Sequence, residues 1–220
     1  MEKVYIGVPT HDNRVSIGTA QCLQRTGEID AIVKMQARSL LCINFNDLFC
    51  QAHNQGADYF LLLHSDIEVT TDKWVERMLE IMKRDKLDVL SVLSPIKNTN
   101  DFSTGASTSN CMRRHRFSKD DIAKLPQTFR TADIRKDWGD DAVLMINTGV
   151  LLVRCKKIKP DIFPFEMLDG CRNVDGKYMT DNVPEDWMFS MHLNGSAVPY
   201  ACTREISLLH YGVSGWSNQI

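Results

Sequence analysis

A short apolar run that ends in three polar residues constrains this chain more than any other stretch of its sequence. Tyr59 to Leu63 are five consecutive large apolar residues, typical of a strand buried on both faces at the centre of a parallel sheet. His64, Ser65 and Asp66 follow at once. Open α/β folds bind ligands at the carboxyl edge of the sheet, so Asp66 is placed where such a fold would use a carboxylate. Asp and Ser at a strand end also suit an ordinary turn.

The remaining apolar pattern predicts strands and helices in alternation. Strands are expected at 4–8, 31–35, 59–63 and 89–93, and helices at 16–25, 40–54 and 74–82, the last capped by the Thr-Thr-Asp cluster at 70–72. This order predicts an α/β fold with a doubly wound, mostly parallel sheet flanked by helices. Two strands hinged at 147–149, a helix opening at 182–187 and strands at 197–202 and 205–209 predict a smaller, mixed C-terminal portion.

Length and charge limit the classes of protein that fit. With 220 residues, one sizeable α/β core is favoured over two small domains. The 26 Lys and Arg against 28 Asp and Glu argue against a general nucleic-acid-binding surface without excluding a nucleic-acid partner. No apolar run reaches the length of a membrane span and no signal peptide opens the chain, so we expect a cytoplasmic protein. Seven cysteines without a CxxC pair predict free thiols.

The sequence pattern leaves the function of two segments open. Residues 97–110 are rich in Asn, Ser, Thr and Gly, which predicts a long irregular loop that could close over a ligand as a lid. The run at 113–116, Arg-Arg-His-Arg, is the one basic cluster. It is either a solvated surface run or a contact for a phosphate or an acceptor.

The last third of the sequence holds a second group of polar residues. Glu185 and Asp186 follow Pro184 in the first turn of the expected helix, where acids are also common because they complement the helix dipole. His210 ends a late strand before Tyr211 and Gly212, a position that an ordinary core histidine could also occupy. Neither feature is specific by itself.

Taken in order, these short motifs resemble the GT-A-fold nucleotide-sugar glycosyltransferases, most nearly the glycosyltransferase family 2 type. The motifs are PTH at 9–11, AR at 37–38, HSD at 64–66, NTG at 147–149, EDW at 185–187 and HYG at 210–212. The resemblance covers nearly the whole chain. It implies a single GT-A-like domain over 1–220, in which 1–95 bind the nucleotide sugar and 96–220 bind the acceptor.

The resemblance also implies roles for individual residues. Asp66 matches the last acid of the DXD motif, which holds a divalent cation on the donor diphosphate, and His210 matches a histidine that completes the metal shell. Asp186 matches the base that activates the acceptor, with Glu185 beside it. The expected nucleotide-sugar site comprises Pro9, Thr10, His11, Arg38, His64, Ser65, Asp66 and Gly149. His64 departs from the family pattern, because the first DXD position is often an acid.

Elementary chemistry gives separate reasons for these residue types. A cation stabilises the charge that develops on a leaving diphosphate, and a positioned carboxylate that takes a hydroxyl proton typically contributes about 10²–10⁴-fold in rate. Carboxylate and imidazole ligands together favour Mn²⁺ over Mg²⁺ as the cofactor.

We therefore expect an enzyme that moves a sugar from a nucleoside diphosphate, with UDP as first guess, to an acceptor hydroxyl of a glycan or other molecule. One displacement with Asp186 as base implies inversion. A nucleotidyltransferase is an alternative, although 8–18 has Arg14 as its only cation and no clustered glycines. A non-catalytic nucleotide-sugar-binding module is another, with His64 marking a decayed metal site. A DNA-modifying transferase stays open if the 113–116 cluster contacts phosphates.

Overall fold

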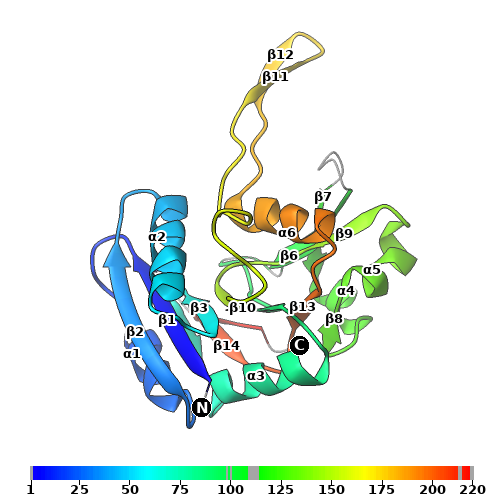
Figure 1. Ribbon diagram of the computed structural model, residues 1–220. Coiled ribbons are helices and arrows are strands. Elements are labelled where there is room, and N and C mark those ends of the chain that lie inside the picture. The colour runs from blue at the N-terminus through cyan, green and yellow to red at the C-terminus, as the bar shows by residue number, and fades with distance from the viewer. Residues whose placement is uncertain (1, 98, 100, 109–113, 213–214, 219–220) are drawn as a thin grey trace.

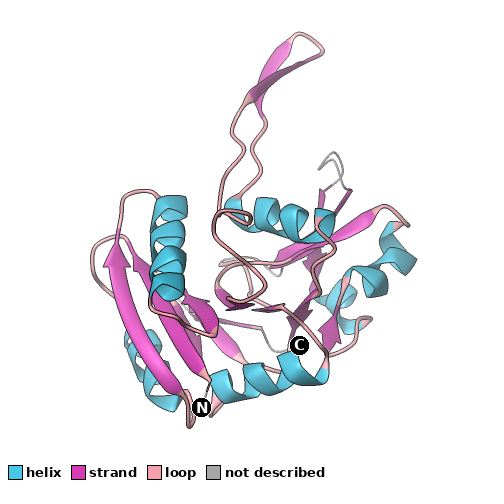
Figure 2. Cartoon of the chain, viewed as in Figure 1, coloured by secondary structure: helices cyan, strands magenta, loops and turns pink. Residues whose placement is uncertain are grey.

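A twisted central sheet organises the chain in the computed structural model, which describes residues 2–97, 99, 101–108, 114–212 and 215–218. Across these residues the sheet has seven strands, with helices on both faces (Figures 1 and 2). Their spatial order is β2 (Asp30–Ala37), β1 (Lys3–Thr10), β3 (Tyr59–Leu63), β10 (Val150–Arg154), β5 (Val89–Val92), β13 (Tyr200–Thr203) and β8 (Thr128–Phe129). Only β10 and β8 run antiparallel to their neighbours within this described sheet. The predicted fold class is confirmed.

The helices bury the two faces of β3 in separate cores. They are α1 (Ile17–Cys22) with a 3₁₀ turn (Leu23–Arg25), α2 (Leu41–Asn54), α3 (Trp74–Arg84), α4 (Lys119–Ala123), α5 (Thr131–Trp138) and α6 (Glu185–Gly195). Phe60 belongs to the core that α2 covers through Phe45, and Leu61 to the core that α3 covers through Trp74. All five residues of β3 are buried, as the apolar run predicts. Alternation of side chains along the strand supplies both cores.

Three smaller sheets complete the described chain. They are β7 (Arg114–Ser118), β6 (Asp101–Thr108) and β9 (Ala142–Met145); β15 (Gly215–Ser217), β14 (Leu208–Tyr211) and β4 (Ile67–Val69); and the hairpin of β11 (Cys171–Val174) and β12 (Lys177–Thr180). The hairpin extends away from the rest of the molecule (Figure 1). His210, expected after a strand, lies inside β14.

The loop predicted at 97–110 is wrong over 101–108, which form β6. This strand pairs with both β7 and β9, and Phe102 and Thr104 are buried in it. Small polar residues are accepted there because the neighbouring strands satisfy their backbone groups. An irregular lid at 101–108 is therefore excluded, while 98, 100, 109 and 110 lie outside the described residues.

The cap predicted for α3 is also wrong. Lys73 is the N-cap, in a left-handed conformation with φ of 50° and without a side-chain cap. The Thr71 hydroxyl instead accepts a hydrogen bond from the backbone N–H of Ser207 at 2.8 Å. The Thr71 hydroxyl, which the local sequence assigns to the cap of α3, therefore binds Ser207, 136 residues away in sequence.

Two further expectations concern the cysteines and membrane spans. The cysteines in the described residues are free thiols, as predicted: Cys22, Cys42, Cys50, Cys155, Cys171 and Cys202. Cys111 lies outside them. None of the described helices is long and apolar enough to span a bilayer.

Candidate functional site

A cluster of charged side chains surrounds Asp66 at the carboxyl edge of the central sheet. The ammonium group of Lys97 donates to Asp66 Oδ2 at 2.5 Å, and His210 Nε2 lies 3.6 Å from the same oxygen. Burial alone would raise the pKa of Asp66, but hydrogen bonds from His210 and Lys97 hold that pKa well below its usual range. Asp66 is therefore ionised at neutral pH, as a cation-binding carboxylate must be.

His210 is held in one orientation by the backbone. Its Nδ1 lies 2.8 Å from the carbonyl oxygen of Pro95, and because a carbonyl only accepts hydrogen bonds, Nδ1 carries the proton. Nε2 then faces Asp66, as a donor when the ring is protonated and with a free lone pair when the ring is neutral. A histidine that donates its other ring nitrogen to a carbonyl is the usual arrangement of a metal ligand.

The donor atoms around Asp66 fit a cation that is shared with a substrate. Asp66 and His210 offer one oxygen and one nitrogen, a pair that Mn²⁺ accepts. Within the described residues, no group of three or more His, Cys, Asp and Glu side chains could hold a metal ion. A cation bound by one or two protein groups normally completes its shell with phosphate oxygens and water. Asp66 and His210 would thus be two of the ligands of such a cation.

His64 lies at the first position of the HSD motif as a neutral residue. Burial lowers the pKa of His64 to about 4, and its ring packs against Phe45 with centroids 5.4 Å apart. Its Nε2 is buried and has no hydrogen-bond partner among the described residues. An unpaired buried nitrogen costs about 1–3 kcal/mol. His64 therefore brings an imidazole nitrogen, and no negative charge, to the position where the family often has an acid.

The two acids that open α6 differ in their surroundings. Glu185 is buried, at 9% exposure, and its carboxylate forms a hydrogen bond with the Thr148 side chain, while burial raises its pKa. Burial, and then the charge of Glu185, raise the pKa of Asp186 to about 8. Asp186 Oδ1 accepts the backbone N–H of Trp187 at 2.8 Å. A carboxyl that titrates near neutrality suits proton transfer at physiological pH.

The NTG turn connects these acids to the end of β3. The backbone N–H of His64 donates a hydrogen bond to the carbonyl oxygen of Gly149 at 2.9 Å, and Gly149 follows Thr148 in the chain. The Asn147 side chain holds the turn by donating to the Val92 carbonyl at 2.9 Å and by accepting the Gly149 N–H at 3.0 Å. The structure therefore brings Glu185 and His64 to the two sides of one turn, although they are 121 positions apart in the sequence.

The residues expected near the nucleotide base lie at the carboxyl ends of β1 and β2. Pro9 and Thr10 are the last residues of β1 and are buried, whereas His11 is exposed. The Thr10 hydroxyl accepts the backbone N–H of Asn13 at 3.0 Å, so it organises the turn. Arg38 is about half exposed and pairs with Asp47 of α2 at 2.6 Å. Among described residues, no hydrogen bond or ion pair connects these residues to the Asp66 cluster.

Lys97 is the functional candidate that sequence reasoning missed. It lies five residues after the end of β5, in the segment Pro95-Ile96-Lys97, and was the first residue of the loop predicted at 97–110. The available signal was a lone cation just beyond the carboxyl end of a parallel strand, where ligands bind.

A basic pocket lies where α6 begins. Its volume is about 500 Å³, and it is lined by Arg114, Arg116, Asn182, Pro184 and Trp187. The Arg116 guanidinium lies 5.9 Å from the centroid of the Trp187 ring, and its charge lowers the pKa of Asp186 against the effect of burial. Arg114 donates to the Asn182 carbonyl at 2.6 Å. Arg114 and Arg116 of the basic run therefore lie beside the start of α6, whereas His115 pairs with Asp121. Arg113 lies outside the described residues.

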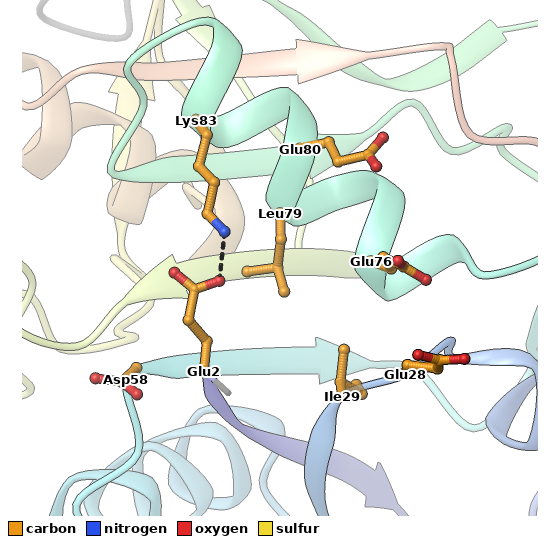
Figure 3. A pocket seen from close by; sticks show the side chains of 8 residues that line it. All are labelled: Glu2, Glu28, Ile29, Asp58, Glu76, Leu79, Glu80 and Lys83. Carbon is orange, nitrogen blue, oxygen red and sulfur yellow. Dashed lines mark ion pairs between the residues drawn. The ribbon is translucent and has the colours of Figure 1, made fainter.

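A second pocket, of about 560 Å³, lies at the opposite, amino edge of the sheet and does not suit an anionic ligand (Figure 3). Its lining is Glu2, Glu28, Ile29, Asp58, Glu76, Leu79, Glu80 and Lys83. Lys83 is already paired with Glu2 at 2.7 Å. Carboxylates so grouped would repel the phosphates of a nucleotide.

Comparison with known proteins supports the fold and goes no further. No family model and no curated protein sequence matches the chain. The crystal structure of A197 from STIV is similar, with a TM-score of 0.58 and 11% identity over 96% of this chain and 86% of that one. CMP:2-keto-3-deoxy-manno-octonic acid synthetase with CTP gives 0.45 and 13%, over 91% and 89%. UDP-glucose pyrophosphorylase from Leishmania major gives 0.34 and 14%, over 69% and 35%. The chain thus shares the α/β fold of A197.

Proposed function

We propose that this chain is a glycosyltransferase that moves a sugar from a nucleoside-diphosphate sugar to a hydroxyl group of a glycan or another acceptor. One observation carries the proposal: the Asp66, Lys97 and His210 cluster lies at the sheet edge to which the Thr148–Gly149 turn also connects the Glu185–Asp186 pair. Breaking the donor requires positive charge on the leaving diphosphate. Activating the acceptor requires a group that takes a proton.

On the donor side, residues of 1–95 with Lys97 and His210 would bind the nucleotide sugar. Asp66 and His210 would hold a divalent cation, Mn²⁺ before Mg²⁺, and such a cation supplies Lewis-acid stabilisation of the diphosphate. Lys97, paired with Asp66 in this structure, would turn to a phosphate oxygen when the donor binds. Pro9, Thr10, His11, Arg38, Ser65 and Gly149 would line the rest of the site, and His64 would present its unpaired nitrogen.

On the acceptor side, Asp186 is our first choice for the base and Glu185 the second. The ionised Asp186 would take the hydroxyl proton as the oxygen attacks the anomeric carbon, so the bond to the diphosphate breaks in the same displacement with inversion. Because burial raises the pKa of Asp186, its carboxylate is a stronger base than an exposed one. The pocket beside Arg116 and Trp187 would receive the acceptor.

A nucleotide-sugar screen tests the proposal. The purified protein is incubated with UDP-, GDP-, CMP- and TDP-sugars, with and without Mn²⁺, and its melting temperature and the release of free nucleotide are measured. Binding raises apparent stability by about 2.7 kcal/mol at 100 times Kd. We expect stabilisation and slow nucleoside-diphosphate release with one donor, UDP-sugars first. Stabilisation without turnover when acceptors are supplied would favour a binding module, and pyrophosphate formed from a nucleoside triphosphate and a sugar phosphate would favour a nucleotidyltransferase.

A further inference from the structure

The outer edge of the central sheet is a long unpaired strand. Within the described residues, β2 pairs with β1 alone, over eight residues in continuous register, and lies at the margin of the molecule (Figure 1). An exposed edge of this length offers its free N–H and C=O groups to another strand unless proline, bulges or charged side chains, lysine above all, block it. β2 has no proline and no bulge against β1. Whether its edge can pair therefore depends on its two charged residues, Asp30 and Lys34.

The direction of the free backbone groups follows from one hydrogen bond. The backbone N–H of Arg38, directly after β2, donates to the Thr10 carbonyl at the end of β1 at 3.4 Å. The backbone N–H and C=O groups of successive residues point to alternate sides of a strand. The even-numbered residues of β2 therefore direct these groups toward β1. The odd-numbered residues, Ala31, Val33, Met35 and Ala37, then present their N–H and C=O groups to the outside.

The charged residues of β2 would pair with those of a second, antiparallel copy of the same strand. Asp30 and Lys34 are both exposed, and neither pairs with any residue that the structure describes. They are spaced evenly about Ile32 and lie on the same face of the strand as Ile32, because side chains alternate. An antiparallel copy of β2 centred on Ile32 therefore sets each Asp30 opposite a Lys34 of the other copy.

We propose that two copies of this chain associate through β2, antiparallel about a two-fold axis at Ile32, so that the two central sheets become continuous. In this register Ala31 lies opposite Val33, and these are the residues whose backbone groups point outward, so they exchange N–H···O bonds. Asp30 and Lys34 fall at a non-hydrogen-bonded pair, where side chains approach most closely. Val33 and Met35, at 46% and 40% exposure, gain cover from the second copy.

Two neighbouring registers pair the charges of β2 less well. An axis at Lys34 places two ammonium groups opposite each other, which is destabilising. An axis at Val33 leaves Lys34 opposite Ile32 and Asp30 opposite Gln36, so neither charge has a counter-charge. The two-fold interface, with the same patch on both copies, is the commonest arrangement of soluble homo-oligomers.

Sedimentation analysis with charge-swapped variants tests this register. Asp30→Lys and Lys34→Asp each turn both cross-strand pairs from attraction to repulsion, and we expect each variant alone to have a dimer Kd raised at least about tenfold. An equimolar mixture of the two variants restores both pairs in a heterodimer, so association should return. Val33→Pro removes an outward N–H without touching the β1 ladder and should also give monomers. Circular dichroism checks that each variant is folded.

Each outcome decides the proposal. A wild-type dimer, weakened by both single variants and restored in the mixture, supports the edge and its register. A wild-type monomer at 100 µM chain overturns the proposal. A dimer that survives Val33→Pro means that the copies meet elsewhere. A dimer lost in Val33→Pro but not recovered in the mixture overturns the register centred on Ile32.

Discussion

Replacing Asp186 by Asn should make the protein more stable while nearly abolishing transfer. Asn keeps the size of the side chain and an oxygen that can accept the Trp187 N–H, which Asp186 Oδ1 accepts at 2.8 Å. It cannot take a proton. If Asp186 is the base, transfer falls by about 10²–10⁴-fold, or about 3–5 kcal/mol of barrier. Nucleotide affinity should change little, since the donor-side cluster around Asp66 stays intact.

The gain in stability follows from the pKa of Asp186. Burial and the charge of Glu185 raise that pKa from 3.8 to about 8, so between about pH 4 and pH 8 the folded state holds a proton that the unfolded state has lost. The free energy of unfolding therefore falls as pH rises through this window. At 1.36 kcal/mol per unit, the penalty at pH 7 is at most about 4 kcal/mol. Because the Asn amide must also be desolvated, we expect a net gain of roughly 1–3 kcal/mol.

Urea unfolding from pH 5 to pH 8.5, together with a transfer assay, measures both effects. The wild type should lose stability with rising pH more steeply than Asp186→Asn, and the difference between them should be largest at high pH. Asp120→Asn is a matched control, because Asp120 is an exposed acid in the first turn of α4 and should change neither activity nor the pH slope. Glu185→Gln should lower the pKa of Asp186. If Asp186→Asn retains transfer within about threefold of wild type and has the wild-type pH slope, Asp186 is not the base and its pKa is not raised.

Three further predictions concern the neighbouring residues. His210→Ala should weaken nucleoside-diphosphate binding with Mn²⁺ and leave the metal-free affinity nearly unchanged, by calorimetry with and without chelator; equal losses would make His210 structural. Lys97→Met should raise the Mn²⁺ affinity and lower the metal-free nucleotide affinity by roughly tenfold; no change in either would exclude Lys97 from the site. Gly149→Ala should cost about 1–3 kcal/mol by urea unfolding, because its Cβ would lie 2.7 Å from Ile67 Cδ1, whereas Gly195→Ala, with nothing within 4 Å, should not.

The local sequence pattern was sufficient to predict the central strand of the fold. The apolar run of β3 predicts a strand buried on both faces, and Asp66 lies at its carboxyl end because parallel strands share that edge. The capping box of Ser118 and Asp121 that opens α4 likewise joins two residues only three positions apart. These features depend on residues adjacent in sequence.

Long-range pairing explains what the sequence could not show. The sequence of β6 resembles a loop because Asp, Gly and Ala are depleted in strands and Ser also suits turns, yet pairing with β9, about 40 residues away, satisfies its backbone. The Thr71 hydroxyl accepts a hydrogen bond from Ser207 rather than capping α3. The contact of Lys97 with Asp66 could not be predicted for the same reason, because it forms only when the folded chain brings the ends of β3 and β5 together. The Lys97 ammonium group then lies 2.5 Å from Asp66 Oδ2. Glu185 and Asp186 also differ in their surroundings, because Thr148 acts on one and Arg116 on the other, and both come from other parts of the chain.

The most direct test of the central claim is product analysis after incubation with a nucleotide sugar, Mn²⁺ and a panel of hydroxyl acceptors. Chromatography measures the free nucleotide, and proton NMR gives the anomeric configuration of the product. A glycosyltransferase of this kind should release nucleoside diphosphate in equal amount to a glycoside of inverted configuration, and both products should be lost in Asp186→Asn. Release of pyrophosphate from a nucleoside triphosphate with a sugar phosphate, or binding of the sugar nucleotide with no turnover on any acceptor, would contradict the proposed function.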